Sequence, residues 1–104
     1  MSYKRVLLKL SGEAIKADSA SIFDCEKLNE VTDMIIKMRN NGTQVCVVIG
    51  AGNIWRGRIA ETIGAERVPA DFMGMLGTVI NAIALAGAVR NKGVSATVFS
   101  AIPA

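Results

Sequence analysis

Two short apolar segments, each followed at once by small and polar residues, constrain the fold of this chain most strongly. They are Arg5–Leu10 (RVLLKL) and Gln44–Ile49 (QVCVVI). Short apolar runs that end in turn residues are typical of buried strands. The segment between them is long enough to contain a helix, and such crossovers connect parallel strands. The sequence therefore predicts two parallel strands joined through a helix.

The segment between the two strands has the pattern of an amphipathic helix. Asp24 is a favourable N-cap residue, and Asn41-Gly42 suits a left-handed C-terminal cap. Between these positions apolar residues recur at steps of three and four, which places them on one helical face. These residues are Leu28, Val31, Met34, Ile35 and Met38.

The rest of the chain continues the alternation of helices and strands. We expect a short helix over residues 54–62, a long helix over about Ala70–Asn91 that begins near Pro69 and is closed by Gly93, and a third strand at Ser95–Ser100. This order predicts an α/β fold with a parallel sheet and helices on both faces. Because the sheet edge after the third strand would be uncovered, we expect the chain to be part of a larger domain.

Composition excludes several classes of protein. Hydrophobic residues make up 51% of the chain and charged residues 20%, which is typical of a globular domain. The net charge of +3, without a run of Lys or Arg and with few aromatic residues, does not indicate a nucleic-acid interface. No uninterrupted apolar run reaches the ~18 residues of a membrane span.

The inventory of possible metal ligands is small. The chain has no histidine, and its two cysteines, Cys25 and Cys46, do not have the spacing of metal ligands. These facts exclude a zinc site and a mechanism that uses histidine as acid or base. We interpret both thiols as reduced and structural, which fits a cytoplasmic protein.

Polar, glycine-containing turns follow both predicted strands. They are Lys9–Glu13 and Gly50–Asn53, and in a parallel sheet both lie at the edge where α/β proteins bind ligands. Glycine lets backbone amides approach an anion closely, and Lys9 and Arg56 carry charges suited to phosphate oxygens. Asp71 is expected at the start of the long helix, where its carboxylate could accept hydrogen bonds from sugar hydroxyls.

Each of these features also has a purely structural explanation. A glycine pair after a strand often forms only a tight turn, and the Lys9 side chain can extend along the strand to water. Asp71 can simply favour the helix dipole. Small residues recur along the long helix and are most simply explained by close packing: Gly74, Gly77, Asn81, Ala84, Gly87 and Ala88.

Two common nucleotide-binding motifs are absent. The chain contains no G-x-x-x-x-G-K-[ST] sequence, so it has no Walker-type P-loop. The second turn begins like a dinucleotide-binding fingerprint at Gly50 and Gly52, but Trp55 occupies the position of the third glycine. That position requires a small residue for close packing of helix and strand.

Four segments together resemble the bacterial UMP kinases of the amino acid kinase family in order and spacing. They are Lys9–Ala14 (KLSGEA), Gly52–Gly57 (GNIWRG), Asp71–Thr78 (DFMGMLGT) and Ser100–Pro103 (SAIP). The resemblance covers the whole chain. It implies a three-layer αβα sandwich with a mainly parallel sheet. Residues 1–104 would form the N-terminal, UMP- and phosphate-binding part of a single domain, without its C-terminal ATP-binding half.

The resemblance also implies an activity and roles for individual residues. The activity is transfer of the γ-phosphoryl group of ATP to UMP, with Mg²⁺ accompanying ATP and no metal ligand assigned to this chain. Lys9 and Arg56 would be catalytic, and Ala51 and Asp71 would bind UMP, although glycine is common in the family at the position of Ala51. The residues that would bind ATP are Lys9, Leu10, Ser11, Gly12, Gly52 and Arg56.

The resemblance further implies a cytoplasmic homo-oligomer, a hexamer in the family, with ATP and UMP as its ligands and neither nucleic acid nor membrane as a partner. Two alternatives stay open. The protein could be another phosphotransferase of the same fold that acts on a carboxylate or carbamate. It could also be a non-catalytic oligomerisation module that packs through the small residues of its long helix. The isolated chain is expected to be inactive.

Overall fold

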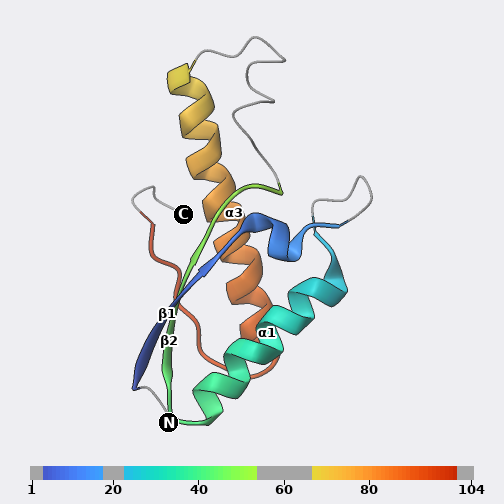
Figure 1. Ribbon diagram of the computed structural model, residues 1–104, viewed down its shortest axis with the longest axis vertical. Coiled ribbons are helices and arrows are strands. Elements are labelled where there is room, and N and C mark those ends of the chain that lie inside the picture. Colours follow the sequence, from blue (N-terminus) through green and yellow to red (C-terminus); the bar gives the residue numbers. More distant parts are fainter. Residues whose placement is uncertain (1–3, 18–22, 54–66, 101–104) are drawn as a thin grey trace.

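The computed structural model describes residues 4–17, 23–53 and 67–100 (Figure 1). Its elements, in chain order, are strand β1 (Arg5–Leu10), a 3₁₀ helix η1 (Gly12–Ile15), helix α1 (Cys25–Asn40), strand β2 (Gln44–Ile49) and helix α3 (Arg67–Asn91). The short helix expected over residues 54–62 lies outside the described residues. The first two predicted strands and both longer predicted helices are present.

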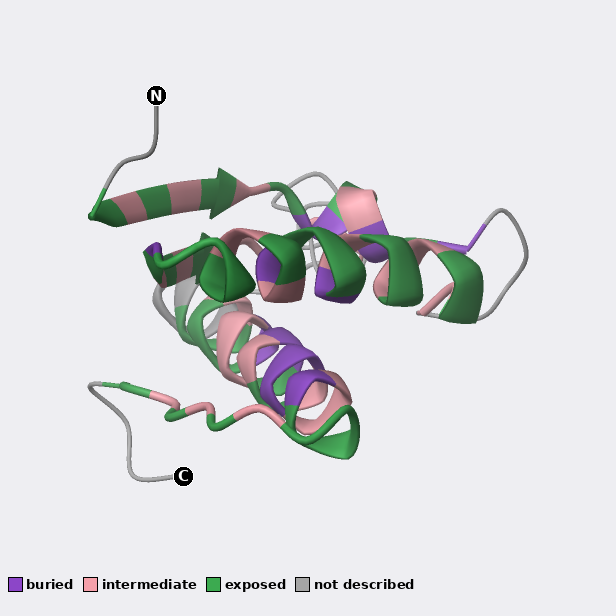
Figure 2. Ribbon diagram, turned by 90° about the horizontal axis from the view of Figure 1, so that it is seen from below, coloured by how far each residue is buried: buried purple, intermediate pink, exposed green. Residues whose placement is uncertain are grey.

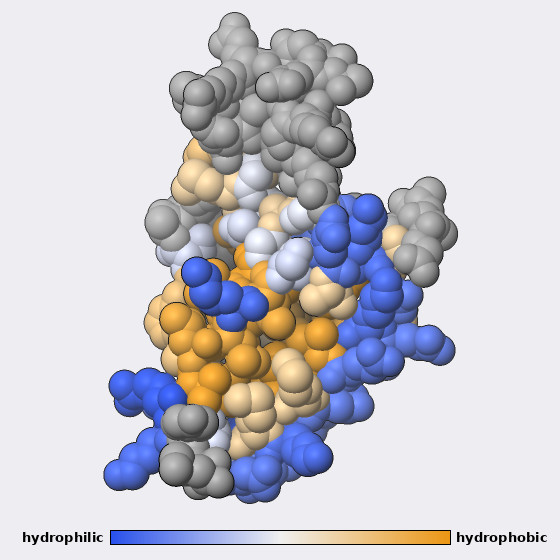
Figure 3. Space-filling model, in the orientation of Figure 1, coloured by the Kyte–Doolittle hydropathy of each residue, from blue (hydrophilic) through white to orange (hydrophobic). Residues whose placement is uncertain are grey.

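Strands β1 and β2 pair in parallel, as the sequence predicts, in a register that runs from Arg5 opposite Gln44 to Leu10 opposite Ile49. Burial alternates along both strands. One face of the sheet therefore packs against the helices, and the other exposes Leu7 (62%) and Val48 (53%). Figure 3 shows hydrophobic residues gathered on the side of the molecule where Figure 1 shows the two strands.

Helix α1 begins and ends where the sequence predicts. The Asp24 side chain accepts hydrogen bonds from the backbone N–H groups of Glu26 (2.9 Å) and Lys27 (3.1 Å). These bonds satisfy two of the donors that a helix N-terminus leaves without an intrahelical partner. At the other end Asn41 is the C-cap, and Gly42 has φ of 89°, the left-handed conformation that glycine adopts without strain.

The buried core joins four elements. Ile15 of η1, Ile35 of α1, Ile49 of β2 and Leu85 of α3 form one cluster, and partly buried residues of β1 and β2 pack against it. Both helices thus cover the same face of the sheet, and their buried residues face this shared interior (Figure 2). The expected α/β class with a parallel sheet is confirmed. Of the three layers expected, the described residues form the sheet and one helical layer.

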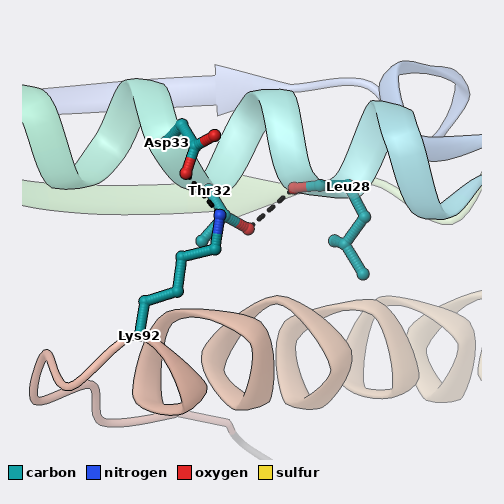
Figure 4. A network of polar contacts seen from close by, with 4 residues as sticks. All are labelled: Leu28, Thr32, Asp33 and Lys92. Carbon is teal, nitrogen blue, oxygen red and sulfur yellow. Dashed lines mark hydrogen bonds and ion pairs between the residues drawn. The ribbon is translucent and has the colours of Figure 1, made fainter.

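Polar contacts accompany the packing of α1 near α3 (Figure 4). Thr32 is fully buried, and its hydroxyl donates to the Leu28 carbonyl one turn earlier in α1 (2.7 Å). Lys92, just beyond the end of α3, forms an ion pair with Asp33 of α1. The side chains of Lys92 and Asp33 are both partly exposed, so this ion pair contributes little to stability.

Helix α3 begins at Arg67, three residues before its predicted start at Ala70, and ends at Asn91 as predicted. Pro69 therefore lies in the first turn, where its missing N–H costs no intrahelical hydrogen bond. The earlier start places Asp71 in the second turn instead of the first. Because the favourable effect of an acidic residue on the helix dipole is largest within the first turn, this explanation of Asp71 is weakened.

The predicted third strand, Ser95–Ser100, is wrong for the described residues. This segment follows Gly93, whose φ is 83°, and it forms no strand although its burial alternates. The Arg90 side chain donates two hydrogen bonds, of 3.0 and 2.6 Å, to the Ala96 carbonyl. An extended segment becomes a strand only by pairing with a neighbour, and in the described residues the sheet contains β1 and β2 alone.

One helix in the described part of the chain is long and apolar enough to cross a membrane by length and composition. It is Phe72–Asn91, with a mean hydropathy of 1.9. The window is not an uninterrupted apolar run, because it also contains Asn81 and Arg90. Core helices pass the same test, and α3 packs into the core through Leu85. We infer no membrane span from it.

Candidate phosphate-binding edge of the sheet

The turns that follow β1 and β2 pack against each other at the carboxyl edge of the sheet. The Gly50 amide donates to the Leu10 carbonyl (2.9 Å), which extends the pairing of the strands into the turns. Gly12 is buried, and a Cβ atom at this position would lie 2.6 Å from both the Asn53 Oδ1 and the Gly52 nitrogen. Atoms this close overlap, so only glycine fits here without displacement of the second turn.

The first turn is stabilised by its own near neighbours. Ser11 is the N-cap of η1, and its Oγ accepts a hydrogen bond from the Glu13 N–H (3.2 Å). The Ala14 amide donates to the Ser11 carbonyl (2.9 Å), and the Lys16 amide donates to that of Glu13 (3.2 Å). These bonds place Gly12 at the first position of η1, where it packs against the second turn.

Lys9 and Leu10 lie on opposite faces of the sheet at the end of β1. Leu10 packs against the core, whereas Lys9 is exposed on the open face, opposite Val48 of β2. Within the described ranges no hydrogen bond or ion pair joins the Lys9 side chain to another residue. An unpaired ammonium group at this edge is available to an anionic ligand.

The remaining predicted site residues are placed only in part. Ala51 and Gly52 lie in the turn after β2 and are half-buried. Asp71 belongs to the second turn of α3, and Arg56 lies outside the described residues. The structure therefore brings the predicted residues of both turns together, and it leaves the positions of the Asp71 side chain and of Arg56 undescribed.

Asn81 of α3 contacts the second turn directly, although the sequence pattern indicated only one member of a series of small residues. It is fully buried, and its Nδ2 donates to the Gly50 carbonyl and to the Asn53 Oδ1, both at 2.7 Å. The Asn53 Nδ2 donates in return to the Asn81 Oδ1 (3.1 Å). The available signal was an amide side chain among apolar residues of a helix, because such a buried group requires hydrogen-bond partners.

The described residues contain no group of three or more His, Cys, Asp or Glu side chains that could bind a metal ion. Cys25 and Cys46 are both free, as expected of reduced thiols, and both are exposed. The structural role expected of both thiols stays a prediction.

The fold and this edge define the chain as an α/β protein with glycine turns packed together where the parallel strands end. The family comparison then makes the assignment specific. The model of the amino acid kinase family matches residues 4–104, so the chain belongs to the amino acid kinase family.

Curated relatives and solved structures show which members of this family the chain resembles. The chain is 46% identical to the uridylate kinase of Mycoplasma capricolum subsp. capricolum over 97% of its length, and 41% identical to that of Pediococcus pentosaceus over 98%. The crystal structure of UMP kinase from Ureaplasma parvum superposes on 97% of the chain with a TM-score of 0.90 and 40% identity. UMP kinase from Bacillus anthracis covers 88% of the chain with a TM-score of 0.82 and 42% identity.

The chain spans less than half the length of these proteins. It covers 43% and 42% of the two curated relatives, and 44% and 38% of the two solved chains. The resemblance is thus to the N-terminal part of uridylate kinases, as the four sequence segments indicate.

Proposed function

We propose that this chain forms the phosphate-binding edge of a UMP kinase, which transfers the γ-phosphoryl group of ATP to UMP and yields UDP. The packing of Gly12 against Gly50, Gly52 and Asn53 carries the proposal. It brings two glycine-containing backbone segments together at the sheet edge where α/β proteins bind their ligands. The similarity to uridylate kinases over 97% of the chain supports the choice of nucleotide.

Phosphoryl transfer needs alignment of donor and acceptor and neutralisation of the charge on the transferred group. In our proposal Lys9 supplies a positive charge to that group, and the backbone around Ser11, Gly12 and Gly52 binds the phosphates of ATP. Arg56 supplies a second cation. No general base is required, because the attacking oxygen belongs to the phosphate of UMP, which is already ionised.

UMP is proposed to lie on the side of the second turn. Ala51 would contact it through the backbone, and Asp71 would accept hydrogen bonds from the ribose hydroxyls. Mg²⁺ is proposed to arrive with ATP and to neutralise charge on its phosphates.

We further propose a cytoplasmic homo-oligomer that binds neither nucleic acid nor membrane. The proposal of an oligomer is supported by apolar residues that α3 exposes along its outer face. They are Phe72, Met73, Met75, Leu76, Ile80 and Ile83, with exposed fractions between 39% and 51%. Exposed apolar surface of this kind on a soluble protein favours contact with further protein.

An acceptor screen on the full-length protein tests the function. The protein would be incubated with ATP, Mg²⁺ and one acceptor at a time: UMP, CMP, N-acetylglutamate, aspartate or carbamate. We expect phosphorylation of UMP alone. Turnover of a carboxylate or carbamate in its place would show a different phosphotransferase of this family. The isolated residues 1–104 are expected to form no UDP, and UDP formation by this chain free of contaminating kinase would contradict that expectation.

A further inference from the structure

Asn81 is the only polar side chain of α3, within the described residues, that is fully buried and bonded to the candidate site. It lies in the helix between apolar neighbours, yet its amide makes three hydrogen bonds to the turn after β2. Two of them form a reciprocal pair with the Asn53 amide, and the third reaches the Gly50 carbonyl. Both ends of the turn are thus bonded to one helical residue.

The bonds from Asn81 continue to the first turn through Asn53. The Asn53 Oδ1 that accepts from Asn81 is the atom that a Cβ at Gly12 would approach most closely, together with the Gly52 nitrogen. The position of Asn53 therefore sets how closely the two turns approach each other. A shift of this side chain changes the space above Gly12 and the direction of the Gly52 backbone.

Loss of Asn81 would remove three hydrogen bonds from the turn after β2. The Gly50 carbonyl and the Asn53 amide, both in half-buried residues, would lose hydrogen bonds of 2.7 to 3.1 Å. Polar groups that lose hydrogen bonds inside a protein are destabilised, and a turn can recover those bonds from water by moving toward solvent. Helix α3, whose own hydrogen bonds do not depend on this side chain, would remain in place.

We propose that Asn81 is a positioning residue, which fixes the Gly50–Asn53 turn against Gly12 in the arrangement that binds nucleotide phosphates. This inference rests on the proposed function, because it assigns the two turns to phosphate binding. Asn81 does not touch the ligand. It acts through Asn53 and Gly50, so its removal changes ligand affinity in a protein that is still folded.

The test replaces Asn81 with leucine, which has nearly the same shape and no hydrogen-bonding group, in the full-length protein. Binding of ATP and of UMP is measured by calorimetry well below the unfolding temperature of each variant. Hydrogen–deuterium exchange is followed in peptides that cover residues 11–15 and 44–53. We expect roughly tenfold weaker binding of both nucleotides, the scale of one lost buried hydrogen bond, and faster exchange in both peptides.

A matched control separates positioning from stability. Thr32→Val also removes a fully buried side-chain hydrogen bond with little change in shape, but the partner of Thr32 is the Leu28 carbonyl in its own helix. This variant should lower the melting temperature and leave both affinities within about twofold of wild type. Equal loss of affinity in the Thr32 and Asn81 variants would reduce Asn81 to a general contributor to stability and overturn the proposal.

The remaining outcomes are also decisive. If Asn81→Leu does not fold, Asn53→Ala removes the same reciprocal pair from the side of the turn and should produce the same changes. Wild-type affinity and wild-type exchange in a folded Asn81 or Asn53 variant would overturn the inference. Failure of the wild-type protein to bind ATP or UMP would instead refute the proposed function. Exchange alone would then show whether Asn81 positions the turns.

Discussion

The two turns at the carboxyl edge of the sheet are stabilised in different ways. The turn after β1 depends on bonds between near neighbours, such as the one from the Glu13 N–H to Ser11 Oγ, two residues apart. The turn after β2 depends on Asn81, which lies 31 residues from Gly50 and 28 from Asn53. The first turn can therefore form from local sequence, whereas the second requires α3 to be in place.

This difference matches the different ligands that the proposed function assigns to the two turns. The β1 turn, with Lys9 beside it, is assigned to ATP and the transferred group, and the β2 turn is assigned partly to UMP. The turn proposed to bind ATP, the phosphoryl donor, then depends on local sequence. The turn proposed to contact UMP, the phosphoryl acceptor, depends on the packing of α3. Substitutions in and near each of the two turns should show this difference.

The largest effect is expected from Lys9→Ala, which removes the charge at the β1 end. Because Lys9 would stabilise charge that moves during transfer, kcat should fall by roughly a hundredfold or more, with a much smaller change in the KM for UMP. Steady-state kinetics of the full-length protein measures both. Lys37→Ala, at an exposed position in the last turn of α1, is the control and should leave kcat unchanged. An unchanged kcat in the Lys9 variant would remove Lys9 from the mechanism.

Gly12→Ala should disrupt the contact between the two turns. The new methyl group would overlap the Gly52 nitrogen and the Asn53 Oδ1, each 2.6 Å away. Overpacking of this kind costs roughly 1–3 kcal/mol, so the melting temperature should fall by several degrees and the affinities for both nucleotides should fall with it.

Gly87→Ala is the matched control for this substitution. Gly87 lies inside α3, and a Cβ there would meet nothing within 4 Å. The change should stabilise the helix by about 0.5–1 kcal/mol, because alanine loses less backbone freedom than glycine on folding. Thermal denaturation of the two variants should shift in opposite directions. A Gly12 variant as stable as wild type would mean that the turns do not pack as closely as described.

Asp71→Asn should weaken UMP binding and leave ATP binding nearly unchanged. A carboxylate accepts hydrogen bonds from two neighbouring hydroxyls, whereas an amide has one acceptor oxygen and loses the charge. The KM for UMP should rise on the order of tenfold, equivalent to ~1.4 kcal/mol, and the preference for UMP over deoxy-UMP should narrow. Titration of both nucleotides measures this effect. Equal UMP affinity in mutant and wild type would show that Asp71 does not bind the ribose.

The smallest effect is expected from Ser11→Ala, which tests the local character of the first turn. Loss of the N-cap bond to the Glu13 N–H should cost on the order of 1 kcal/mol of stability. Ser95→Ala, at an exposed position after α3, is the control and should change stability by a few tenths of a kcal/mol at most. Chemical denaturation measures both. If Ser11→Ala lowers the free energy of unfolding by several times this amount, the first turn also depends on distant contacts.

The elements that sequence patterns predicted correctly are those with a local physical cause. Helix α1 has an N-cap at Asp24, a left-handed Gly42 and one apolar face, and all three act within a few residues of chain. The parallel pairing of β1 and β2 follows from the length of the crossover between them. The position of both turns at one edge of the sheet follows in turn from parallel pairing.

Other features were decided by tertiary structure. The segment Ser95–Ser100 has the composition of a strand, but a strand exists only when another strand pairs with it, and pairing is not encoded within six residues. Asn81 looks like one small residue among many until the fold brings it to Gly50 and Asn53. By itself the sequence determined which segments are helical or extended and that glycine turns end the strands. Only the packing of α3 on the sheet, through contacts between residues far apart in the chain, decided which side chain holds those turns in place.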